Sequence, residues 1–143
     1  MSELLNFSQR NRIFNTLRGF EEDLHMANHW LSEYEEQGSL YHYYLKLSPE
    51  YFPYIQNLIA EALKIIGDLS MQLHLSKREE NAARMIMGRM TMDWTYLSDC
   101  HAKDLRSSGA VHPGLAELLD SSIDRLAQIA LDLGHIFGRS PMK

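Results

Sequence analysis

The chain has 143 residues, of which 45% are hydrophobic and 23% charged, and its formal net charge is −5. This composition is typical of a globular domain and excludes a disordered chain, and a domain of this size can fold without a metal or a disulfide. Because Lys and Arg are scattered among a larger number of Asp and Glu, the charge disfavours nucleic-acid binding.

The sequence also indicates where the protein works. Its one cysteine, Cys100, allows no intrachain disulfide and fits a reducing compartment. No apolar run approaches the ~20 residues that a membrane span needs, and the start of the chain has no apolar run of signal-peptide length. We therefore expect a cytoplasmic protein that does not bind membranes.

The first predicted helix covers residues 8–37. Its apolar residues recur every three or four positions, which is the signature of one buried helix face. Gly38 follows where a glycine cap is expected. The predicted stripe is Ile13, Leu17, Phe20, Leu24, Ala27, Leu31 and Tyr34.

The second predicted helix covers residues 48–75, with Ser48 as its N-cap and Pro49 in its first turn. Its core stripe is Tyr51, Ile55, Leu58, Ala62, Ile66, Leu69 and Leu73, flanked by Phe52 and Ile59.

The third predicted helix covers residues 77–107 and follows a capping-box pattern of Ser76 and Glu79. Its stripe is Ala83, Ile86, Met90, Trp94, Leu97 and His101. The fourth predicted helix covers residues 113–137 and begins at Pro113. Its stripe is Leu115, Leu118, Leu119, Ser122, Leu126, Ile129, Leu133 and Ile136.

These segments predict the fold class. No segment alternates polar and apolar residues between hairpin turns, so we expect no β-sheet. Four long amphipathic helices, with short second and third connections, predict an all-α protein. We expect one domain over residues 1–143, folded as an antiparallel up-down-up-down four-helix bundle.

A candidate metal site lies in the first helix, where Glu22, His25 and His29 are spaced so that their side chains can approach one another. Histidines four apart on a helix can bind a divalent transition metal such as Zn²⁺. At 100° per residue, however, all three point roughly 120–180° away from the core face. This phase favours a solvated or interfacial helix face, and a metal site completed by a second chain stays the alternative.

His101 is a second candidate, because it falls within the apolar stripe of the third helix. A buried imidazole needs hydrogen-bond partners, and Tyr34, Tyr51 and Asp104 are expected at the same end of the bundle. A core histidine with its hydrogen bonds satisfied is the favoured interpretation. The alternative is a ligand-binding or acid–base group in a pocket beside the tyrosine-rich connection between the first two helices.

Met26 and Trp30, four residues apart, form an apolar patch on the outer face of the first helix. Such patches often mark protein interfaces. Because the inward positions are almost wholly apolar, we expect no enzyme activity. We expect a non-catalytic interaction protein that forms a homodimer or binds a partner protein. The alternative function is a bundle that binds a metal or small ligand at a site rich in His and Tyr.

Overall fold

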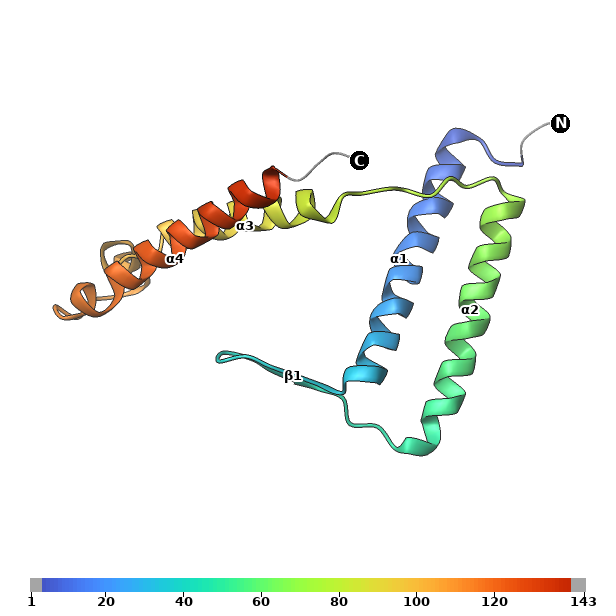
Figure 1. The fold of residues 1–143 in the computed structure, drawn as a ribbon, viewed down its shortest axis with the longest axis horizontal. Helices are drawn as coiled ribbons and strands as arrows, with labels where there is room; N and C mark the ends of the chain where they lie inside the picture. The colour runs from blue at the N-terminus through green and yellow to red at the C-terminus, as the bar shows by residue number, and fades with distance from the viewer. Residues whose placement is uncertain (1–3, 140–143) are drawn as a thin grey trace. The chain divides into compact units, whose positions relative to one another are not determined.

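The computed structural model describes residues 4–139, and most of these residues are helical, which confirms the all-α class. The α-helices are α1 Phe7–Glu33, α2 Phe52–Gln72, α3 Ala82–Ser98 and α4 Leu115–Gly138 (Figure 1). The shorter elements are the strands β1 Glu35–Gln37 and β2 His42–Tyr44 and the 3-10 helices η1 Pro49–Tyr51 and η2 Ala102–Ser108.

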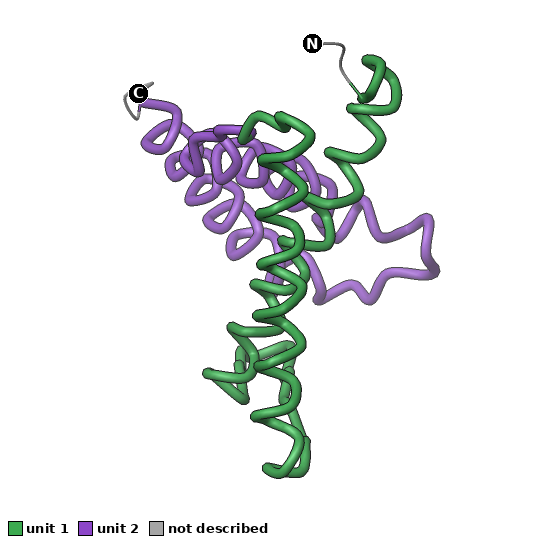
Figure 2. The backbone as a smooth tube through the Cα atoms, turned by 90° about the vertical axis from the view of Figure 1, so that its right-hand side faces the viewer, with its two compact units in different colours: residues 1–77 green, residues 78–143 purple. Residues whose placement is uncertain are grey.

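The chain divides into two compact units, residues 1–77 and residues 78–143 (Figure 2). Within the first unit α1 packs on α2, and within the second α3 packs on α4. Each unit is therefore a helical hairpin with a core of its own. The single four-helix bundle, and with it a single domain, is not confirmed and stays a prediction.

The first helix ends earlier than predicted, at Glu33 instead of residue 37. Its start is secured by a capping box, in which the side chains of Asn6 and Gln9 each accept a hydrogen bond from the other's backbone N–H. At its end Tyr34 adopts a positive φ of 61°, which turns the chain out of the helix. The carboxylates of Glu35 and Glu36 would be unfavourable in a last helical turn, because the helix dipole is negative there.

The expectation of no sheet was wrong, because β1 and β2 form a short antiparallel ribbon. Glu35 pairs with Tyr44 and Gln37 with His42. Tyrosine favours extended backbone, which explains why the tyrosine-rich connection pairs as strands. Strands of three residues are too short to show a recognisable alternation of polar and apolar residues.

The core of the first hairpin agrees with the predicted stripes. Leu24, Ile59 and Ile66 are buried. The partly buried residues around them are Leu17, Ala27, Leu31, Ile55, Ala62 and Leu63. Arg10, near the start of α1, links the two helices at the end of the hairpin away from the β-ribbon. Its Nη1 donates to the carbonyls of Leu73 and His74, just after α2, at 2.6 and 2.9 Å.

The third predicted helix is shorter at both ends. It begins at Ala82, after Asn81 accepts a hydrogen bond from the backbone N–H of Ala83, so the capping box predicted at Ser76 was wrong. It ends at Ser98, and η2 follows after a break. Ser98 and Asp99 have short polar side chains that compete with helical hydrogen bonding, which favours termination there.

The fourth helix packs with a different face from the one predicted. Its buried residues are Ile123, Ala127, Ala130 and Gly134. The centre of this face lies about 110° around the helix from the centre of the predicted leucine stripe. Small residues let α3 approach closely: a Cβ at Gly134 would lie 3.6 Å from the Met90 Cβ and 3.9 Å from the Met87 carbonyl oxygen.

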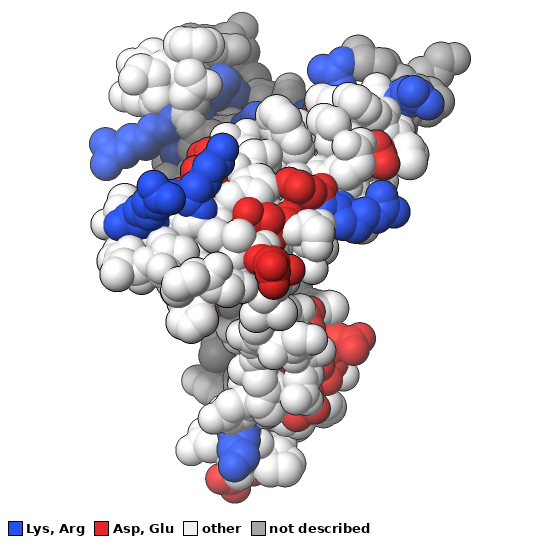
Figure 3. Space-filling view, turned by 90° about the vertical axis from the view of Figure 1, so that its left-hand side faces the viewer, with Lys and Arg blue, Asp and Glu red and all other residues white. Residues whose placement is uncertain are grey.

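Large apolar side chains of α4 therefore stay in contact with solvent. The exposed fractions of the residues that form this open stripe lie between 36 and 78%. The open stripe comprises Leu118, Leu126, Ile129, Leu133 and Ile136. In Figure 3, charged side chains occur in separate groups with broad uncharged areas between them. No helix within residues 4–139 is long and apolar enough to span a bilayer.

Candidate functional site

A polar cluster around His101 joins α3, η2 and α4. His101 is the N-cap of η2, not part of a continuous third helix, so its predicted place in an apolar helix stripe was wrong. Its side chain is 21% exposed. The position still requires hydrogen-bond partners, and the structure supplies them from all three elements.

Both ring nitrogens of His101 face hydrogen-bond acceptors. Nε2 lies 2.5 Å from Oδ1 of Asp124, and Nδ1 lies 3.2 Å from the carbonyl oxygen of Ser98. Oδ2 of Asp104 is 3.6 Å from Nδ1 and accepts a hydrogen bond from the His101 backbone N–H. Because a carboxylate and a carbonyl can only accept, both nitrogens must donate, which requires the imidazolium form.

The electrostatics of this cluster favour the same form. The hydrogen bond to Asp124 raises the pKa of His101 most, and partial burial opposes it by disfavouring the charge. The Ser98 carbonyl and the negative charges of Asp124 and Asp120 raise the pKa further. In this state the ring has no free lone pair to accept a substrate proton, so the geometry suits a structural contact better than a general base. We call this contact, which His101 makes with Ser98, Asp104 and Asp124, the clasp.

A second contact strengthens the clasp between η2 and α4. Oδ1 of Asp120 accepts a hydrogen bond from the backbone N–H of Ala102 at 2.8 Å. Asp120 and Asp124 are one helical turn apart on α4, so one edge of that helix holds both the start of η2 and His101. Neither Asp120 nor Asp124 was predicted to lie beside His101, although the spacing of His101 and Asp104 is that of a capping box.

Two of the residues predicted to share a ligand site with His101 belong to the other unit. Tyr34 stacks on Phe52 with a ring-centroid separation of 5.7 Å, and Tyr51 is exposed in η1. Asp104 alone lies beside His101. A single ligand site formed by His101, Tyr34, Tyr51 and Asp104 therefore stays a prediction.

The candidate metal residues lie on the exposed surface of α1, as the helix phase predicts. Glu22 forms an ion pair with Arg18, with 2.5 Å between Oε1 and Nη1. His25 is exposed, and the ring of His29 packs edge-on against that of Trp30. Within residues 4–139, no group of three or more His, Cys, Asp or Glu side chains is arranged to hold a metal ion. A metal at Glu22, His25 and His29 stays a prediction.

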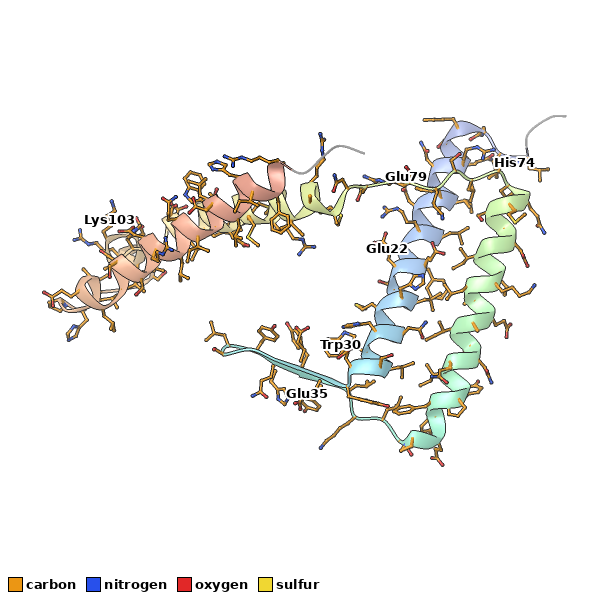
Figure 4. The ribbon with its side chains drawn as sticks, viewed as in Figure 1. Glu22, Trp30, Glu35, His74, Glu79 and Lys103 are labelled. Carbon is orange, nitrogen blue, oxygen red and sulfur yellow. The ribbon has the colours of Figure 1, made fainter. Side chains whose placement is uncertain are left out.

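The predicted interface patch lies close to the β-ribbon. Met26 is exposed, while the Trp30 ring packs edge-on against Tyr43 at a centroid distance of 6.2 Å. Figure 4 shows Glu22 and Trp30 on the side of α1 that faces away from α2. Trp30 is thus held partly by the ribbon, and a role for Met26 and Trp30 in binding a partner stays a prediction.

An open apolar groove of about 470 Å³ runs along the second hairpin between α3 and α4. Its apolar lining includes Met90, Tyr96, Leu97, Leu126, Ile129 and Leu133. The groove continues the open stripe of α4. The spacing of Ala127, Ala130 and Gly134 is the sequence signal that could have shown which face packs on α3 and which stays open.

The pH dependence of stability tests the clasp. The raised pKa of His101 means that its contribution is fully present below the ordinary histidine value of about 6.5 and is lost as pH rises through the higher folded-state pKa. We expect Asp124→Asn to flatten this loss. Urea midpoints measured from below about pH 6.5 to alkaline pH check it, with Trp94 fluorescence as the probe in a Trp30→Phe background.

Glu117→Gln is the control for Asp124→Asn, because it also removes one carboxylate from α4, and the hydrogen bonds and ion pairs of His101 in the described structure go to Ser98, Asp104 and Asp124. Its pH profile should follow that of the unchanged protein. Identical profiles for Asp124→Asn and the unchanged protein would show that His101 is not held as an imidazolium by Asp124.

The site thus consists of two features of residues 78–143: a charged clasp that fixes η2 on α4, and an open apolar surface formed by α4 and the groove beside it. The clasp holds η2 on α4, and the apolar surface is open to solvent. Comparison with known proteins finds no matching family model, no similar curated protein and no similar solved structure.

Proposed function

We propose that this chain is a non-catalytic helical interaction protein that self-associates as a homodimer. The observation that carries this proposal is the open stripe of α4, where large apolar side chains remain exposed although the helix is already packed on α3. A contiguous exposed apolar surface of this kind usually marks an interaction site.

The magnitude of the driving force supports association. Full burial of one Leu or Ile side chain contributes about 1.5–3 kcal/mol. Association costs on the order of 4–15 kcal/mol in lost freedom of motion. The side chains of the open stripe are already partly buried, so each contributes only part of that figure. Two copies together bring two open stripes into one interface, and the gain from burying both is of the same order as the cost of association.

A four-helix bundle within one chain is the alternative way to cover the open stripe. In that arrangement the α1–α2 hairpin would take the place of the second copy. Exposed Phe20, Leu58 and Ile65 on that hairpin support this alternative. The two arrangements differ in mass, because a bundle within one chain is a monomer.

Sedimentation of the full chain and of Leu126→Lys tests the homodimer. We expect a dimer at micromolar concentration, and a dissociation constant at least tenfold higher for Leu126→Lys, because a lysine ammonium must be desolvated in the interface. Glu117→Gln is the control: it changes the net charge by the same amount at an exposed position of α4 outside the open stripe. A monomeric unchanged protein would contradict the proposal and favour the bundle within one chain.

The setting of the protein is part of the proposal. We propose a cytoplasmic location, which the exposed free thiol of Cys100 supports because such thiols persist in reducing compartments. The net charge of −5 supports a protein partner over nucleic acid.

A further inference from the structure

We propose that a second copy of the chain seats its α4 antiparallel on α4 about a two-fold axis, in a register set by two reciprocal ion pairs between Arg125 and the partner's Asp132. This inference rests on the self-association proposed above. It adds the surface, the orientation and the residues that select them.

The spacing of the open face suits an antiparallel pair. Ser122, Leu126, Ile129 and Leu133 follow one another at intervals of four, three and four residues, so the pattern reads the same in both directions. A two-fold axis between positions 127 and 128 sets Leu126 opposite the partner's Ile129. The same axis sets Ser122 opposite the partner's Leu133, and a small side chain then faces a large one.

Arg125 and Asp132 lie on the same edge of the open stripe, roughly 60° and 80° from its centre, and α3 covers the other edge. In an antiparallel two-fold pair, like edges meet. Arg125 then lies about 3 Å along the axis from the partner's Asp132, at 1.5 Å per residue, which is within reach of its long side chain. The symmetry repeats this pair on the other side of the axis.

The Arg125 guanidinium and the Asp132 carboxylate can both form a further ion pair. Arg125 makes no ion pair with any residue in the described part of the chain. Asp132 accepts one hydrogen bond, from Gln128 Nε2 to Oδ1 at 2.9 Å, which leaves Oδ2 for a guanidinium. A reciprocal Arg–carboxylate pair fixes geometry as well as sign, because its hydrogen bonds are directional.

The position of α3 argues against a parallel pair. In a parallel two-fold pair, opposite edges meet, so α3 of one copy would lie over Arg125 and Asp132 of the other and desolvate their charges without partners. The antiparallel pair places both α3 helices on the same side of the two α4 helices. The grooves of the two copies then face each other, and Met90, Leu97, Leu126, Ile129 and Leu133 become the core of a four-helix assembly built from two hairpins.

Charge reversal tests the register with the full chain. Arg125→Asp and Asp132→Arg each convert both reciprocal pairs to repulsion, and we expect each to raise the dissociation constant roughly tenfold at low salt. The double variant Arg125→Asp/Asp132→Arg restores opposite charges and should return to within about threefold of the unchanged protein. An equimolar mixture of the two single variants should associate better than either alone.

The outcomes separate this inference from the proposed function. If Leu126→Lys dissociates the dimer while both single charge reversals leave it unchanged, self-association stands and the register is wrong. If the single variants weaken association but neither the double variant nor the mixture restores it, the pairing of Arg125 with Asp132 is wrong. If the unchanged protein is a monomer, the proposed function itself fails.

Discussion

Ile66→Ala is expected to lower the free energy of unfolding of the α1–α2 hairpin by about 3 kcal/mol, within the usual range for removing a buried isoleucine. Ile66 is 7% exposed and packs with Leu24 and Ile59 in the small core of this hairpin. The core has few other buried side chains to compensate, so the cavity left by the substitution would remain largely unfilled.

The preceding residue provides a matched control. Ile65 is 50% exposed, and Ile65→Ala removes the same atoms from a position outside the core. We expect a loss of less than about 1 kcal/mol. Similar losses for Ile65→Ala and Ile66→Ala would contradict the helix phase on which the core assignment depends.

The two tryptophans allow each hairpin to be followed separately, because Trp30 lies in residues 1–77 and Trp94 in residues 78–143. A Trp94→Phe background leaves Trp30 as the probe for the Ile66 and Ile65 variants. Urea unfolding should be measured at one fixed protein concentration, since self-association makes apparent stability concentration-dependent.

Gly134→Phe is expected to lower the free energy of unfolding of the α3–α4 hairpin by about 2–3 kcal/mol. Gly134 is buried where α4 meets α3, and a Cβ there would already contact Met90 and the Met87 carbonyl. An aromatic ring has no room at this distance, so the helices would have to separate and lose their packing along the small-residue face.

Gly134→Ala tests the same geometry in the opposite direction. The nearest atom to the added Cβ would be 3.6 Å away, which is ordinary van der Waals contact. Alanine also gains up to about 1 kcal/mol of helix propensity over glycine. We therefore expect unchanged or higher stability, measured through Trp94 in a Trp30→Phe background. A large loss for Gly134→Ala would show that the helices lie closer than the structure places them.

Much of the helical architecture could be predicted because it depends on local periodicity. The alternation of three and four residues located α1 and α2 and placed Leu24 and Ile66 in a core. The end of α1 could not be predicted in the same way. Gly38 looked like a helix cap, but pairing between Glu35 and Tyr44 across the ribbon competed with the last helical turn.

The candidate site shows a similar division. The sequence indicated that His101 needs polar partners, and Asp104 was among the residues expected beside it. Asp124 could not be found, because its contact with His101 joins positions 23 residues apart and depends on how η2 folds back on α4. The acidic and imidazole groups of α1 lie on the exposed surface, where the helix phase put them.

The sequence by itself determined that four amphipathic helices form, because periodicity and capping act over a few residues. Only the tertiary structure decided which part of the wide apolar arc of α4 would be buried. Periodicity favours the largest side chains, but close packing favours the smallest where two backbones approach. Ala127, Ala130 and Gly134 therefore face α3 beside Ile123, and the leucines and isoleucines of the open stripe remain in contact with solvent.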